Sequence, residues 1–368
     1  MNVFTAIMLV FATVGMLDKV AGGRFRLSES FDKGLLTMGT MCIPMVGMSC
    51  AGVALIQNNT ETIMKVMDTL PFDPSIVAGV LLAPDMGGYF IAEQLSGSKE
   101  LFVFNGIVLG ALLGQMVTFQ LPIFLSSIRK EDSSFVLNGF VAGLIVIPVG
   151  LVAAAALLGV GSGEFVAEFI PLLLICLLMA AGLMKMPEKT VKGFEIFARG
   201  IQIITLILFF ITVMGVFVPS AAYADFSSVE EIVIVVFKSA VIISGSLVLS
   251  ELILRFFGKW IAVIARKLRV NEISVIGILL GCATSLAVLP LISKMDDKGK
   301  LMNGAFSVSG AYFMGGQMGF VSSVADGYTV AVMVIAKVIC GGLGVLLAYK
   351  LYGRFSREAS EIESKEML

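Results

Sequence analysis

Apolar residues run along this chain in stretches of about twenty, separated by short polar or charged connections. A run of roughly 18 or more apolar residues is long enough to cross the hydrocarbon of a bilayer as a helix. The pattern predicts nine spanning helices, at 2–20, 34–57, 101–126, 135–160, 165–186, 197–219, 230–255, 301–325 and 327–351. The chain is therefore expected to be an all-α polytopic membrane protein.

Two further apolar segments are interrupted near their centres. Segment 75–95, "SIVAGVLLAPDMGGYFIAEQL", contains a proline, an aspartate and two adjacent glycines. Segment 272–293, "EISVIGILLGCATSLAVLPLIS", contains small and hydroxyl residues followed by a proline. Each segment either crosses the membrane or enters it and returns on the same side.

The distribution of lysine and arginine decides between these alternatives, because basic residues are enriched in the cytoplasmic loops of membrane proteins. With both segments as hairpins and the N-terminus outside, all but four of the 26 Lys and Arg residues are cytoplasmic. Full crossing would place the basic loops around 129 and 185–199 outside. The exceptions are Lys65 and Lys99 in outside loops and Lys238 and Lys337 within spans. We therefore predict nine transmembrane helices plus two re-entrant helical hairpins, with the C-terminus in the cytoplasm.

This topology is symmetric, since the two hairpins enter from opposite sides and the spans around them match in inverted orientation, as in inverted-repeat transporters. The sequences match too: "AGVLLAPDMGG" (78–88) aligns with "IGILLGCATSL" (276–286), and "NGIVLGALLGQMVTF" (105–119) resembles "NGAFSVSGAYFMGGQMGF" (303–320). The expected units are a first inverted repeat at 1–160 with its hairpin at 75–95, a connector helix at 161–192, a second repeat at 193–352 with its hairpin at 272–293, and a cytoplasmic tail at 353–368.

The tip of the first hairpin is the first candidate site. Pro84 and the pair Gly87–Gly88 are expected to break a helix, and broken backbone inside a membrane must be covered by protein or water. Asp85 adds a charge at the break, followed by Met86. A carboxylate there suits an ammonium group, Na⁺ or H⁺; alternatively, Asp85 caps the following half-helix.

Neutral polar residues occupy the matching positions. Thr284 and Ser285 lie at the second break, where they bind a solute or bond back to a helical carbonyl. Gln115 and Gln317 stand in two matching Gly-Gln-Met sequences. Their amides either bind a hydroxyl or an ammonium group, or join helices to one another.

Two further charges lie in or near spans. Lys337 is in mid-span and could pair with Asp85 or contact a solute. Glu251 could serve as a charge partner or coupling residue, but it lies four residues before Arg255, which favours a local helix-end pair.

Composition excludes several classes. Hydrophobic residues make up 58% and charged residues 14%, against about 45–50% and about 25% in soluble domains. The chain has no histidine, and its five cysteines form no CxxC pair. No catalytic cluster, phosphate-binding loop, metal-ligand set or long basic tract is visible. We expect no enzyme activity, no cofactor, no metal and no nucleic acid; the expected partners are a small solute, the lipid bilayer and a possible second copy in a homodimer.

Four stretches together resemble the ethanolamine permease family of bacteria: "LLAPDMGGYFIAEQL", "IPVG" (147–150), "MPEKTVKGFEIFA" (186–198) and "MDDKGKLMNGAFSVSGAYFMGGQMGF" (295–320). The resemblance covers roughly residues 2–350 and implies passage of ethanolamine across the bacterial inner membrane. Asp85 and its glycines match the family pattern. Better-known members have an Asp-His pair where this chain has Gly316–Gln317, and paired asparagines where it has Thr284–Ser285.

The sequence thus predicts a transporter of ethanolamine or a similar small amine or amino alcohol, working by alternating access. Asp85 would neutralise the amine, while the glutamines and hydroxyls would bind its polar groups. The alternative is a Na⁺- or H⁺-coupled carrier of another small polar metabolite, including a carboxylate, with Lys337 contacting the solute.

Overall fold

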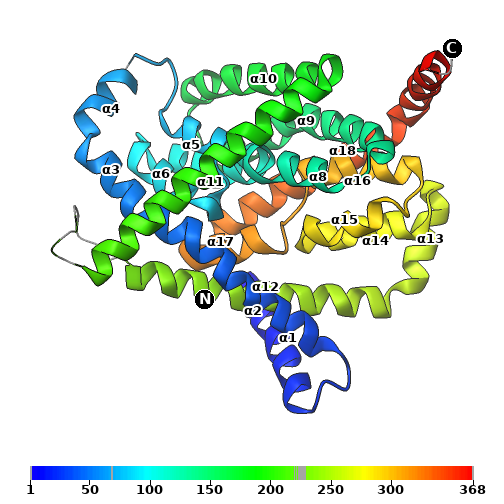
Figure 1. The fold of residues 1–368 in the computed structure, drawn as a ribbon, viewed down its shortest axis with the longest axis horizontal. Helices are drawn as coiled ribbons and strands as arrows, with labels where there is room; N and C mark the ends of the chain where they lie inside the picture. Colours follow the sequence, from blue (N-terminus) through cyan, green and yellow to red (C-terminus); the bar gives the residue numbers. More distant parts are fainter. Residues whose placement is uncertain (1, 68, 219, 221, 223–228, 367–368) are drawn as a thin grey trace.

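The computed structural model describes residues 2–366 of the chain, apart from 68, 219, 221 and 223–228. The described residues form helices joined by turns, with no β-strand among them (Figure 1). The π- and 3₁₀-helices carry η labels. In chain order the helices are α1 (Val3–Val20), α2 (Leu27–Val46), η1 (Gly47–Gly52), α3 (Val53–Asn58), α4 (Thr60–Met67), α5 (Ser75–Leu81), η2 (Pro84–Met86), α6 (Gly88–Leu95), α7 (Lys99–Phe102), η3 (Val103–Gly114), η4 (Met116–Gln120), α8 (Leu121–Ser127), α9 (Lys130–Leu158), α10 (Ser162–Lys185), α11 (Pro187–Phe217), α12 (Val229–Phe256), α13 (Gly258–Leu268), α14 (Glu272–Ala283), η6 (Ser285–Ala287), α15 (Leu289–Ile292), α16 (Asp297–Ser309), α17 (Gly316–Val324) and α18 (Gly327–Glu366). The all-α prediction is confirmed.

Eight helices within the described residues are long and apolar enough to cross a membrane. They coincide with eight of the nine predicted spans: Val3–Val20, Leu27–Asn58, Lys99–Phe124, Glu131–Leu158, Ser162–Lys185, Pro187–Phe217, Val229–Phe256 and Gly327–Gly353. The chain is therefore a multi-pass membrane protein.

The ninth predicted span, 301–325, is not one continuous helix. α16 ends at Ser309, and α17 begins only at Gly316. Tyr312, between them, has a positive φ of 66°, which interrupts a right-handed helix. The intervening sequence is rich in glycine, and a Cβ at Gly315 would lie only 1.7 Å from the carbonyl oxygen of Ala283. The break therefore lets this segment touch the end of α14.

Both interrupted segments fold back on themselves. α5 packs against α6, and α14 packs against the short α15 (Figure 1). Each turn contains one 3₁₀ turn, η2 in the first hairpin and η6 in the second. We use "first hairpin" for α5–η2–α6 and "second hairpin" for α14–η6–α15.

Hydrogen bonds to an aspartate join the two ends of the first hairpin at its base. The Asp73 carboxylate accepts hydrogen bonds from the amide of Ser75, at 2.9 Å, and from the amide of Gly97, at 2.7 Å. Asn105 Nδ2 donates to Ser75 Oγ and to a carboxylate oxygen of Glu168 on α10, each at 3.0 Å. The two ends of the hairpin are thus tied to each other, to the neighbouring helix and to α10.

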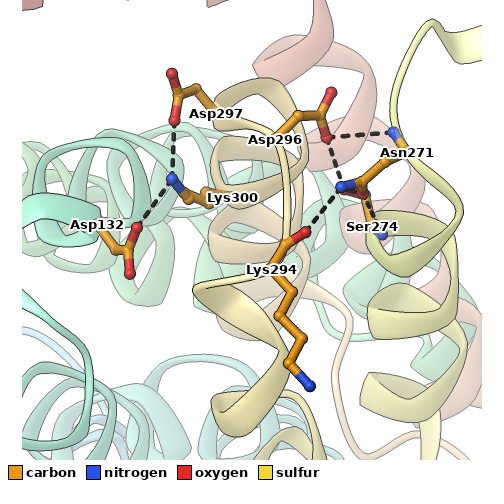
Figure 2. Close-up of polar contacts among 7 residues, drawn as sticks. All are labelled: Asp132, Asn271, Ser274, Lys294, Asp296, Asp297 and Lys300. Atoms are coloured by element: carbon orange, nitrogen blue, oxygen red, sulfur yellow. Dashed lines mark hydrogen bonds and ion pairs between the residues drawn. The ribbon is translucent and has the colours of Figure 1, made fainter.

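Similar hydrogen bonds to an aspartate join the two ends of the second hairpin at its base (Figure 2). Asp296 Oδ1 accepts hydrogen bonds from Ser274 Oγ, at 2.8 Å, and from the Asn271 amide, at 3.4 Å. Asn271 Nδ2 donates to the carbonyl of Lys294, at 2.8 Å. Asn303, the counterpart of Asn105 in the repeat alignment, donates to the carbonyl of Ser274, at 2.9 Å.

The segment formed by η3 and η4 is the central helix of the molecule. It lies within the candidate span Lys99–Phe124, whose most apolar stretch is 94% buried inside the protein. A Cβ at Gly79 would lie 2.2 Å from the Asn105 carbonyl oxygen, and a Cβ at Gly114 would lie 2.2 Å from that of Leu82. These glycines let the first hairpin lie directly against the central helix, a contact typical of packing inside membranes. The π-helical turns here are a feature common near functional sites.

Candidate functional site

A cavity of about 230 Å³ lies where the two hairpin tips meet the broken segment between α16 and α17. Its lining comes from α2, α12, the central helix, both hairpin tips, the break and the start of α17. The residues that line it are Thr37, Thr40, Met41, Pro44, Ala83, Asp85, Met86, Gln115, Phe119, Ile243, Leu247, Ala283, Thr284, Leu286, Tyr312, Gly316 and Gln317. Among these described residues, only Asp85 carries a formal charge.

The backbone of the first tip presents Asp85 to the cavity. The amides of Met86 and Gly88 both donate to the Ala83 carbonyl, at 3.0 and 3.1 Å. Gly87 has a φ of 93°, which favours glycine, and a Cβ there would lie 2.3 Å from the Met48 Cβ. Gly87 and Gly88 therefore shape the turn, while Asp85 and Met86 line the cavity.

The Asp85 carboxylate is available to a ligand. The N-cap position of α6 is Gly87, which has no side chain to cap the helix, and Asp85 lies in the turn before it and lines the cavity. Its Oδ2 lies 3.7 Å from the position that a Cβ would take at Gly316, the first residue of α17. The N-terminus of a helix favours a negative charge through its dipole and free amides.

The broken segment is joined to the end of α14 by backbone hydrogen bonds. The amide of Tyr312 donates to the Gly281 carbonyl, at 3.0 Å, and the amide of Met314 donates to the Cys282 carbonyl, at 2.9 Å. The last carbonyls of a helix have no partner inside that helix. The break between α16 and α17 thus supplies hydrogen-bond donors to the last carbonyls of α14. It also places Tyr312 beside the tip of the second hairpin.

The two glutamines carry unsatisfied polar atoms. Gln317 is buried, and neither its Oε1 nor its Nε2 has a hydrogen-bond partner within the described part of the chain. Gln115 Nε2 donates to Gln120 Oε1 at 2.8 Å, but its Oε1 has no partner there. Leaving a buried polar group unpaired costs roughly 1–3 kcal/mol. A polar solute in the cavity can recover this free energy.

Hydroxyl groups supply further polar atoms at the site. Thr284 lines the cavity, and Ser285 is buried behind it. The buried hydroxyl of Tyr312 lies against Thr284 and Ser285. On α2, Thr37 and Thr40 donate back to the helical carbonyls of Gly34 and Thr37.

The structure therefore brings together Asp85, Met86, Gln115, Thr284 and Gln317 around one cavity. Sequence reasoning missed Tyr312, Thr37 and Thr40. Tyr312 stands in the same glycine-rich motif as Gln317, and the two threonines lie three residues apart in an apolar run. These two patterns could have identified the three residues from the sequence.

The two additional charged candidates lie outside the cavity lining. Lys337 is fully buried on α18, and its Nζ donates to the Ala311 carbonyl, at 2.5 Å. Glu251 forms a partly exposed ion pair with Arg255 four residues later, at 2.7 Å, which matches the local-pair alternative. No group of three or more metal-binding side chains occurs in the part of the chain that the structure describes.

Comparison with known proteins gives one family and several bacterial relatives. The family model described as "Ethanolamine utilisation protein, EutH" matches residues 1–351. A protein of Listeria monocytogenes named probable ethanolamine permease EutH is 28% identical, with 96% of this chain and 94% of that protein covered. Its Escherichia coli namesake is also 28% identical, covering 98% and 97%. The uncharacterised Bacillus subtilis protein YxeR is 25% identical, covering 92% and 90%. No solved structure matches.

Proposed function

Because the chain belongs to the EutH family of ethanolamine utilisation proteins, whose named relatives are probable permeases, we propose that it transports ethanolamine across the bacterial inner membrane. A similar small amino alcohol is the wider substrate class. The chain is a transporter-family protein and not an enzyme. The observation that carries the choice of cargo is Asp85, the single formal charge among the described residues that line the cavity.

The two ends of ethanolamine match two parts of the cavity. Its amine is a cation at neutral pH, so Asp85 binds the ammonium group through a charge-assisted hydrogen bond. Its hydroxyl both donates and accepts, which suits the unpaired amide atoms of Gln317 and Gln115 and the hydroxyl of Tyr312. The changed residues Gly316–Gln317 and Thr284–Ser285 retain polar partners for such a hydroxyl.

The electrostatics of the broken helices support an ionised Asp85. α6 and α17 both begin close to this carboxylate, and helix N-termini stabilise nearby negative charge. Discontinuous helices of this kind form the solute sites of inverted-repeat transporters. A cationic solute then neutralises the remaining charge.

We extend the proposal to topology. Nine segments cross the membrane, the ninth being the broken pair α16–α17, and the two hairpins enter from opposite sides. The N-terminus lies outside and the tail 353–368 in the cytoplasm. The similar hydrogen bonds to the Asp73 and Asp296 carboxylates at the bases of the two hairpins support the assignment of inverted repeats at 1–160 and 193–352 around the connector 161–192. Alternating access follows from this layout; the homodimer stays a prediction.

A carrier of carboxylates is the less favoured function. It requires a cationic group at the solute, and Lys337 was the candidate. Its Nζ is already bound by the Ala311 carbonyl, and the residue is outside the lining of the cavity.

Uptake of labelled ethanolamine by vesicles containing the purified protein tests the proposed function. We expect Asp85→Asn to lower uptake at least tenfold, because hydrogen bonds to charged groups contribute about 1.5–3 kcal/mol. Glu251→Gln is the matched control, since it also removes a carboxylate but lies outside the cavity. Unchanged uptake by a folded Asp85→Asn protein would remove Asp85 from the mechanism.

A further inference from the structure

Lys337 is a second buried charge whose purpose the solute site does not explain. Its side chain has no exposed surface, and its Nζ donates to the carbonyl of Ala311 in the broken segment. Ala311 directly precedes Tyr312, which lines the cavity together with Asp85, so Lys337 lies behind the cavity wall, where its charge and that of Asp85 attract each other. No acidic side chain among the described residues lies within ion-pair distance of Lys337.

The other titratable groups around this pair are neutral when protonated. Tyr312 faces Asp85 from the break, and Cys340 lies one turn from Lys337 on α18. Cys176 on α10 lies behind Cys340. The neighbouring stretch of α9 presents the carbonyl of Val146, which accepts from the Cys340 thiol. Asp85 and Lys337 therefore set the charge of the empty site.

The charges at this position constrain transport. With Asp85 negative and Lys337 positive, the empty site is neutral overall. Adding an ammonium ion would leave one uncompensated positive charge inside the protein, and an unpaired buried charge costs several kcal/mol. Loss of one proton from the pair restores neutrality.

We propose that the entry of the amine expels a proton from Lys337, so that the protein exchanges one ammonium ion for one proton. This inference rests on the proposed function. One N–H bond of the Lys337 ammonium breaks, and the proton leaves to the side of the membrane from which the amine enters. The neutral amine keeps two N–H groups, so its hydrogen bond to Ala311 survives. The solute enters and leaves as a cation, and Lys337 regains its proton when the site empties.

Vesicles containing the full-length protein test the exchange through two readouts. An internal pH dye is expected to report about one proton leaving per ethanolamine taken up, after subtraction of the leak in protein-free vesicles. An inside-negative potential of about 59 mV would accumulate a freely carried monovalent cation about tenfold. Electroneutral exchange predicts no accumulation from this potential. Potential-driven uptake without proton movement would overturn the exchange and leave the proposed function intact, whereas no ethanolamine uptake at all would remove both.

Two variants locate the proton. Lys337→Gln keeps a hydrogen-bond donor near Ala311 but cannot carry the charge. We expect it to lose the proton signal and to accumulate ethanolamine under the applied potential. Lys238→Gln is the matched control, because Lys238 lines a different cavity between α1, α12 and α17; its exchange should equal that of the unaltered protein. Full proton exchange by a folded Lys337→Gln protein would show that Lys337 is not the carrier.

Discussion

At the scale of single residues, the site is marked by polar atoms that the protein leaves unpaired. Gln317 is the clearest case, because both ends of its buried amide lack a partner among the described residues. Native proteins pair nearly all such groups. This arrangement is understandable if the missing partner is the solute, and it implies that the empty site is less stable than an apolar version of it.

The variant Gln317→Met separates the cost of the unpaired amide to stability from its contribution to solute binding. Removing the unpaired amide should raise the free energy of unfolding by about 1–2 kcal/mol, while ethanolamine uptake falls. Thermal unfolding with and without ethanolamine measures the first effect, and vesicle uptake the second. Gln202→Met, at an exposed position on α11, should change neither. A variant that is less stable yet transports normally would assign Gln317 a packing function instead.

At the scale of elements, the break between α16 and α17 is the feature on which the site depends. It supplies Tyr312, frees the start of α17 beside Asp85, and completes the end of α14 through two backbone hydrogen bonds. Gly315 permits the contact, since no larger residue fits against the Ala283 carbonyl.

The variant Gly315→Ala should disrupt the contact between the break and the end of α14 in the second hairpin. Its added methyl group would lie 1.7 Å from the Ala283 oxygen, and overpacking of this kind costs typically 1–3 kcal/mol. Reduced thermal stability and lost uptake are expected. Gly342→Ala on α18, where a Cβ meets nothing within 4 Å, should behave as the unaltered protein. Equal behaviour of the two variants would contradict the assigned contact.

The length of the apolar runs predicted eight of the spanning helices correctly. Pro84, Gly87 and Gly88, which disfavour a continuous helix, predicted the tip of the first hairpin. The ninth span was predicted as continuous because "SGAYFMGGQ" is as apolar as an unbroken helix. Its break depends on a contact with Ala283, which lies about thirty residues earlier and which no local pattern reveals. Tyr312 was missed for the same reason. Asp85 and the glutamines were singled out because a polar residue inside an apolar membrane segment is expensive and therefore conspicuous.

At the scale of the whole molecule, the account requires two hairpins that enter from opposite faces. Most basic residues then lie on one side, and the cavity lies between the two tips. Full crossing by either hairpin would place the tips and the basic loops in a different relation to the membrane.

Labelling of single cysteines in a cysteine-free background tests this topology. Lys65→Cys and Lys99→Cys should react with an impermeant reagent on intact cells, because the loops that carry them are assigned outside. Arg129→Cys and Lys189→Cys should react only after the cells are opened. Labelling of all four positions from the same side would refute the inverted arrangement.

The central claim is that Asp85 binds the amine of the solute between the two hairpin tips. An experimental structure with bound ethanolamine measures this most directly. We predict density in the cavity with the ammonium nitrogen about 3 Å from an Asp85 carboxylate oxygen and the hydroxyl facing Gln317. Ethanolamine bound elsewhere, with the space between Asp85 and Gln317 empty, would contradict the account.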